Sequence, residues 1–98
     1  MTINKTLEGG TLTVALEGRL DTTTAPQLEG ELRTALEGVT KLILDLANLE
    51  YISSAGLRVL LIAQKAMNKQ GEMTIKNANS SLMDIFEITG FVDIFNIE

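Results

Sequence analysis

The chain has 98 residues, of which 45% are hydrophobic and 21% are charged, and its 8 Lys and Arg against 13 Asp and Glu give a net charge of −5. It contains no His and no Cys, which excludes Ser-His-Asp and Cys-His nucleophiles, disulfides, and zinc sites that use those side chains. An acidic chain with only 4% aromatic residues also lacks the basic surface of a nucleic-acid-binding protein, so we expect no direct contact with nucleic acid.

The length predicts a single domain over residues 1–98. The longest apolar run, residues 59–63, is far shorter than the roughly 20 residues that span a bilayer. The first residues show no pattern of a signal peptide. We therefore expect a soluble, cytoplasmic protein that does not insert into membranes.

Two strands and a helix are predicted first. Residues 11–17 alternate polar and apolar side chains, as a half-buried strand does, and the preceding Gly9-Gly10 predicts a tight turn from a strand over residues 2–7. Apolar residues then recur at helical spacing between residues 28 and 36. Thr24 is predicted to begin this helix, because Gln27 follows at the spacing of a capping box.

The middle of the chain is its most hydrophobic part. Residues 41–46 are nearly continuous in apolar character, which predicts a central strand that is buried on both faces. Residues 57–66 carry two adjacent apolar stripes at helical spacing. The sequence therefore predicts a helix that packs against a sheet and ends at Gly71.

The last third predicts a strand, a helix and a further strand. Residues 72–76 alternate as a strand does, and residues 92–97 form a weaker strand pattern. Between them we expect a short helix with Ser80 or Ser81 as its cap and Gly90 as its end.

The predicted order is ββαβαβαβ, which defines the fold class as α/β. Strands joined by helices favour parallel pairing through right-handed crossovers. We expect a sheet of about five strands, parallel or mixed, with helices packed against it. A fold of this class does not by itself define a function.

Patterns of catalytic and phosphate-binding chemistry are missing from the chain. Neither G-x-x-x-x-G-K-[ST] nor G-x-G-x-x-G occurs. Glu29 and Glu31 are two positions apart on the predicted first helix, so their carboxylates point in different directions. We therefore expect that the protein is not an enzyme, and we expect no metal and no cofactor.

The junction between the central strand and the second helix, residues 49–57, is rich in small and hydroxyl side chains. One interpretation is helix capping, in which Ser53 or Ser54 accepts a hydrogen bond from a free backbone amide. The other is regulation, because a serine at an open helix start is accessible to a kinase and its phosphate is tolerated there. The residues alone leave both interpretations open.

The segment Ile52-Ser53-Ser54-Ala55-Gly56-Leu57-Arg58-Val59-Leu60-Leu61 resembles the signature of STAS domains, specifically the bacterial anti-sigma factor antagonists. Gly18-Arg19-Leu20-Asp21 is similar to the Gly-x-Leu-Asp element of that family. Residues 44–49 resemble its central strand, and residues 82–91 resemble its late helix and the turn that follows. The resemblance covers nearly the whole chain in the family's order, so a STAS-like fold is expected.

The resemblance implies a partner-switching function in transcription regulation. The unphosphorylated protein would bind an anti-sigma factor that is also a serine kinase and so release the sigma factor. The alignment with the family motif places the phosphorylated serine at Ser54, with Ser53 as the runner-up. Phosphorylation would prevent binding, and a serine phosphatase would remove the phosphate. ATP and magnesium would belong to the kinase.

The resemblance also implies a partner-binding face, with Asp21 near the acceptor serine and with Leu57 and Arg58 near the rim of the face. The predicted contact residues are Asp21, Thr22, Thr23, Thr24, Ser53, Ser54, Ala55, Gly56, Leu57 and Arg58.

Two alternatives have sequence support of their own. Ser53 stands where many phosphorylated relatives have an acidic residue, and Ala55 stands where they often have a hydroxyl. These differences are compatible with a STAS interaction subunit that is not phosphorylated, as in a lipid ABC transporter or a signalling scaffold. An aspartyl phospho-receiver is suggested by Asp45, but the chain has neither the acidic pair nor the lysine that receivers need.

Overall fold

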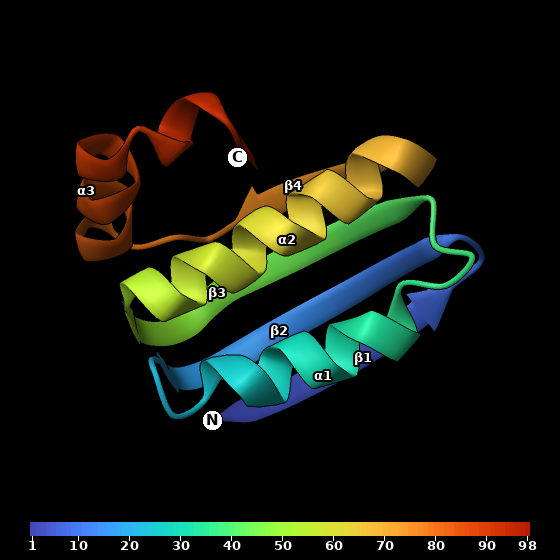
Figure 1. The fold of residues 1–98 in the computed structure, drawn as a ribbon, viewed down its shortest axis with the longest axis horizontal. Helices are drawn as coiled ribbons and strands as arrows, with labels where there is room; N and C mark the ends of the chain where they lie inside the picture. The colour runs from blue at the N-terminus through green and yellow to red at the C-terminus, as the bar shows by residue number, and fades with distance from the viewer.

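The structure, a computed structural model that describes residues 1–98, has the element order that the sequence predicts. A mixed sheet of five strands is combined with three helices and one short 3-10 turn, which confirms the α/β fold class (Figure 1). In chain order the elements are β1 (Thr2–Glu8), β2 (Thr11–Leu20), α1 (Ala25–Ala35), β3 (Lys41–Ile52), α2 (Ser54–Gln70), β4 (Glu72–Lys76), α3 (Ser80–Thr89), the 3-10 turn (Phe91–Asp93) and β5 (Asn96–Ile97).

The strands lie in the sheet in the order β1-β2-β3-β4-β5. The predicted hairpin is confirmed, because β1 runs antiparallel to β2, and all other neighbours are parallel. Strands β2 and β3 extend further than predicted, and their pairing continues to Leu20 and Ile52. The last strand is shorter than predicted, because the 3-10 turn occupies the first residues of the expected range.

Helices α1 and α2 lie side by side on one face of the sheet (Figure 1). Strands β2, β3 and β4 follow one another across the sheet in one direction, so right-handed crossovers place both helices on the same side. The main core lies between this pair and the sheet. None of the three helices combines the length and the apolar character needed to cross a membrane.

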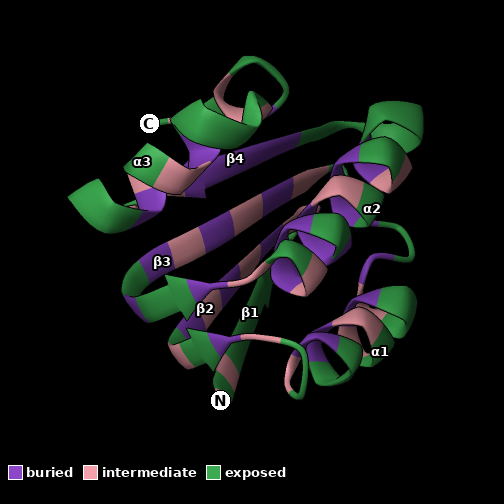
Figure 2. Ribbon diagram, turned by 60° about the vertical axis from the view of Figure 1, so that its left-hand side comes forward, coloured by how far each residue is buried: buried purple, intermediate pink, exposed green.

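The prediction that the central strand is buried on both faces is wrong. Leu42, Leu44 and Leu46 are completely buried, whereas Ile43 and Asp45 between them are half-buried. Figure 2 shows this alternation as bands along β3. The reason is that α1 and α2 cover only one face of the sheet, so the pattern of half-burial applies even to the middle strand.

The glycines predicted to end α2 and α3 are confirmed, whereas the residue predicted to cap the start of α3 is corrected. Gly71 ends α2, and Gly90 ends α3 in a left-handed conformation with φ of 80°. The cap of α3 is neither Ser80 nor Ser81 but Asn79, whose side-chain oxygen accepts a hydrogen bond from the N–H of Leu82 at 2.9 Å. Asn is as good a cap as Ser, so composition alone could not separate these neighbours.

Candidate partner-binding site

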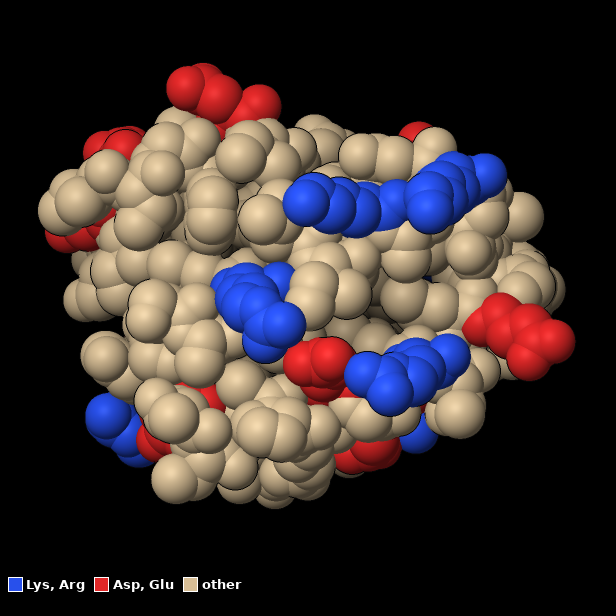
Figure 3. Space-filling view, in the orientation of Figure 1, with Lys and Arg blue, Asp and Glu red and all other residues tan.

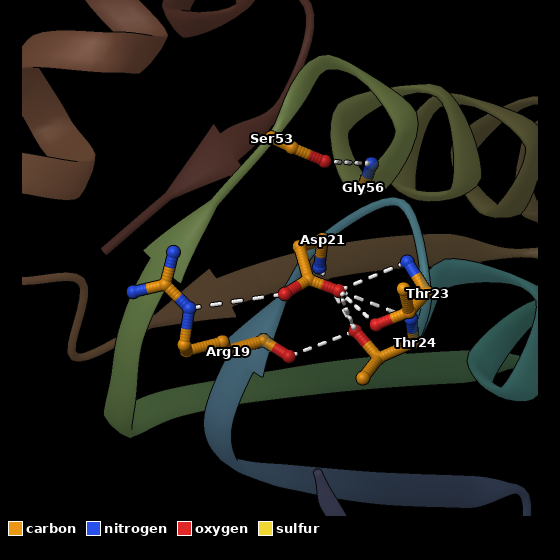
Figure 4. A network of polar contacts seen from close by, with 6 residues as sticks. All are labelled: Arg19, Asp21, Thr23, Thr24, Ser53 and Gly56. Carbon is orange, nitrogen blue, oxygen red and sulfur yellow. Dashed lines mark hydrogen bonds and ion pairs between the residues drawn. The ribbon is translucent and has the colours of Figure 1, made fainter.

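The two segments predicted to form the binding face meet at one edge of the sheet. Leu20 at the end of β2 pairs with Ile52 at the end of β3, and the N–H of Ser53 donates to the carbonyl oxygen of Leu20 at 2.9 Å. Asp21 directly follows Leu20 and Ser53 directly follows Ile52, so both residues lie at this edge of the sheet (Figure 4). Loops at the carboxyl ends of parallel strands are where α/β proteins commonly bind ligands.

The two serines at the start of α2 have different roles in the structure. Ser53 is the N-cap, because its hydroxyl oxygen accepts a hydrogen bond from the N–H of Gly56 at 3.3 Å (Figure 4). Ser54 is the first residue of the helix, is exposed, and its hydroxyl makes no hydrogen bond with the protein. The structure thus assigns the cap to Ser53 and leaves the Ser54 hydroxyl accessible.

Gly56 is small because the helix begins against the end of β2. A methyl group at this position would lie 2.7 Å from Cγ of Leu20 and 3.0 Å from the carbonyl oxygen of Leu20. The sequence predicts an open helix start at this junction. For Gly56, which is buried, the reason is instead a close approach between helix and strand.

The structure exposes only some of the residues predicted to contact a partner. Leu57 was expected at its rim, but this side chain is 6% exposed and belongs to the core. Its neighbour Arg58 is exposed. Of the predicted contact residues, the structure exposes four: Thr22, Thr23, Ser54 and Arg58.

Asp21 organises the turn that leads into α1. Its Oδ1 accepts hydrogen bonds from the N–H groups of Thr23 and Thr24 at 3.0 and 3.1 Å and from the Thr23 hydroxyl at 2.8 Å. In return, Thr24 Oγ1 accepts the N–H of Asp21 at 2.8 Å and donates to the carbonyl oxygen of Arg19 at 2.8 Å. The predicted capping box from Thr24 to Gln27 is wrong, because the Thr24 side chain is used in this turn and makes no cap bond.

Arg19 and Tyr51 are part of the same edge and were missed by the sequence analysis. The two residues are paired across β2 and β3, and the Arg19 guanidinium lies 4.4 Å from the centre of the Tyr51 ring. Arg19 Nε also lies 3.8 Å from Asp21 Oδ2. The signal that could have found them is the strand register, which a single sequence does not reveal.

The pKa of Asp21 is lowered below its ordinary value. The main cause is the hydrogen bond from the Thr23 hydroxyl, with help from the N–H groups of Thr24 and Thr23, and these outweigh the opposing effect of desolvation. No hydrogen bond of Asp21 reaches Ser53 or Ser54 (Figure 4). The structure therefore shows Asp21 fixing its own turn, and it shows no group of three or more acidic side chains that could hold a metal ion.

Asp21→Asn is expected to make stability less dependent on pH in acid. A lowered carboxyl pKa contributes stability that is complete above the ordinary value of 3.8 and is lost as the pH falls through the folded-state value. The Asn variant keeps an oxygen that can accept the same N–H bonds but has no charge to lose. Urea midpoints of the two proteins at pH 7 and pH 3 test this, and an equal fall in both would contradict it.

Comparison with known proteins identifies the family. The model of the STAS domain family matches residues 2–98, so the chain belongs to the STAS domain family. It is 40% identical over 90 residues to BtrV of Bordetella bronchiseptica, which is provisionally described as an anti-sigma factor antagonist; the match covers 90% of this chain and 78% of BtrV. The anti-sigma-B factor antagonist of Bacillus subtilis is 33% identical over 85 residues, which cover 86% of this chain and 78% of that protein.

The fold comparison agrees with this assignment. The Bacillus cell fate determinant SpoIIAA, in its phosphorylated form, superposes with a TM-score of 0.77 at 19% identity, over 99% of this chain and 91% of SpoIIAA. At this identity the match shows a shared fold. The family match and the two relatives, which are described as anti-sigma factor antagonists, confirm the resemblance to STAS domains of the antagonist type that the sequence motifs indicated.

Proposed function

We propose that the protein is an anti-sigma factor antagonist whose binding is switched off by phosphorylation of Ser54. The observation that carries this proposal is the free, exposed hydroxyl of Ser54 at the first residue of α2, in a chain whose relatives are described as anti-sigma factor antagonists. The unmodified protein would bind the anti-sigma factor and so release the sigma factor.

The surroundings of Ser54 suit a reversible modification. Phosphorylation adds about −1.5 to −2 charges, and the positive end of the helix dipole favours negative charge in the first turn. The cap of the helix does not depend on Ser54, because Ser53 supplies it. We therefore expect a phosphate to change the binding face while the domain stays folded.

The chemistry would be carried out by the partners. The anti-sigma factor would itself be the serine kinase and supply ATP and magnesium, and a separate serine phosphatase would restore the hydroxyl. This chain would contribute no catalytic group and would act in the cytoplasm, where sigma factors bind RNA polymerase.

Release of sigma factor from its complex tests this function. Unmodified protein is added to a preformed complex of the anti-sigma factor kinase with a fluorescent sigma factor, and free sigma factor is followed by anisotropy. We expect release that saturates when the antagonist equals the anti-sigma factor in concentration. A tenfold excess of the unmodified protein favours its complex with the anti-sigma factor by about 1.4 kcal/mol through mass action. No release of sigma factor at that excess would contradict the proposal and favour an interaction subunit of another assembly.

A further inference from the structure

Three basic side chains have no acidic partner in the structure, and all three lie on α2. The other basic side chains form five ion pairs with carboxylates, at N–O distances from 3.0 to 3.8 Å. The unpaired ones are Arg58, Lys65 and Lys69, and α2 itself contains no Asp or Glu. A chain with a net charge of −5 thus carries one helix whose positive charge is not compensated.

These side chains form a line that begins at Ser54. At 3.6 residues per turn, positions 54, 58, 62, 65 and 69 fall within an arc of about 80° around the helix and extend over about 22 Å. All five residues are exposed. We call this line, made of Ser54, Arg58, Ile62, Lys65 and Lys69, the α2 stripe. Figure 3 shows positively charged side chains gathered along α2 on this face of the molecule.

An apolar groove runs beside the α2 stripe. It lies between α1 and α2, has a volume of about 450 Å³, and is lined mainly by apolar side chains, among them Leu32, Val59 and Ile62. Ile62, which is 39% exposed, belongs to both the stripe and the groove wall. The groove could therefore receive an apolar side chain from a partner that also contacts the stripe.

We propose that the α2 stripe docks an acidic amphipathic segment of the anti-sigma factor. Carboxylates of that segment would pair with Arg58, Lys65 and Lys69, and one of its apolar side chains would enter the groove at Ile62. The inference rests on the proposed function, because it names the chemistry of the surface that the same partner presents.

The opposite rim of the groove argues against polyanions as the partner. Helix α1 contributes Glu29 and Arg33 to the lining and the turn after it contributes Glu37, and the Arg33 guanidinium is already paired with Glu29 at 3.0 Å. A phosphate-rich membrane or nucleic acid would meet these carboxylates as soon as it covered the groove. A protein segment can place its acidic side chains on the α2 side alone, so the charge arrangement favours a protein.

This arrangement explains how a phosphate on Ser54 would act at a distance along the helix. The phosphate would add about −1.5 to −2 charges to a stripe whose three cations sum to +3, and Arg58 lies one turn from Ser54, at the i,i+4 spacing that lets side chains pair. Phosphorylation would thus both reduce the charge of the stripe and engage one of its three cations. The acidic segment would lose attraction at the very end that the kinase modifies.

A pair of matched double variants tests the stripe. Calorimetry would measure the affinity of purified anti-sigma factor kinase for unmodified protein, for Lys65→Gln/Lys69→Gln, and for Lys41→Gln/Lys76→Gln. Both variants remove two positive charges, but Lys41 and Lys76 lie on strands and are paired with Glu72 and Glu98. We expect about a tenfold loss for the α2 variant, with a weaker salt dependence, and less than about a twofold loss for the control.

Each result decides between the two proposals. Equal affinity of both variants would overturn the stripe and leave the proposed function standing, whereas no binding by the unmodified protein would overturn both. Two further probes are vesicles of phosphatidylglycerol and a DNA duplex. The inference is wrong if the vesicles or the DNA bind the unmodified protein through Lys65 and Lys69 while the Lys65→Gln/Lys69→Gln variant binds the kinase as tightly as the unmodified protein does. In that case the α2 stripe binds a polyanion.

Discussion

Ser54→Ala is expected to abolish phosphorylation by the anti-sigma factor kinase, whereas Ser53→Ala is expected to retain it. The Ser54 hydroxyl is exposed and unbonded, while the Ser53 hydroxyl is held by the N–H of Gly56. A kinase needs a hydroxyl that can reach the γ-phosphate, and of these two serines only Ser54 offers one without breaking a helix cap. Intact-mass spectrometry after incubation with kinase, ATP and magnesium would measure this.

In stability we expect Ser53→Ala to be the affected variant and Ser54→Ala to be nearly unchanged. Ser53→Ala removes the N-cap of α2 and should lower the free energy of unfolding by about 1 kcal/mol. Ser54→Ala changes an exposed first-turn residue and should stay within about 0.5 kcal/mol of the unmodified protein. Phosphate on Ser54→Ala, or none on Ser53→Ala despite a folded protein, would show that the acceptor is wrongly assigned.

Gly56→Ala is expected to destabilise the protein by about 1–3 kcal/mol. The added methyl group would lie 2.7 Å from Cγ of Leu20 and 2.9 Å from Cγ1 of Ile52, and both of these side chains are buried. The nearby carbonyl oxygen of Leu20 cannot move freely, because it accepts the N–H of Ser53. The clash therefore outweighs the gain in helix propensity, which chemical denaturation would measure.

Gly30→Ala is the matched control, because it makes the same change in the other helix of the pair. Gly30 lies inside α1 and is exposed, and apart from its chain neighbours and the adjacent backbone of its own helix no atom lies within 4 Å of where the methyl group would be. This variant should be more stable than the unmodified protein by about 0.5–1 kcal/mol. A loss of stability in Gly30→Ala, or a gain in Gly56→Ala, would contradict the packing described at the start of α2.

The sequence predicted the order of the elements well because each has a local signal. Alternation defined β2, helical spacing defined α1 and α2, and glycines ended α2 and α3 at Gly71 and Gly90. It was also predictable that residues 21 and 53 lie at the same edge of the sheet, since parallel strands bring their carboxyl ends to one edge.

Features that depend on contacts between distant residues were not predictable. A leucine after Gly56 looks equally suited to a rim or to the core, and only the packing of α2 shows that Leu57 is buried. The pairing of Arg19 with Tyr51 depends on a register that includes an irregularity next to Gly18. The roles of Ser53 and Ser54 were separable only once the helix start was placed, because both residues can cap.

The switch proposed at Ser54 is tested most directly by the affinity of the anti-sigma factor for protein that carries phosphoserine at this position. Phosphoserine incorporated during translation makes the test independent of which residue the kinase selects, and the sigma-release assay gives the functional readout. We expect binding at least about tenfold weaker than that of the unmodified protein, and correspondingly less sigma factor released. Equal affinity and equal release for the two forms would contradict it.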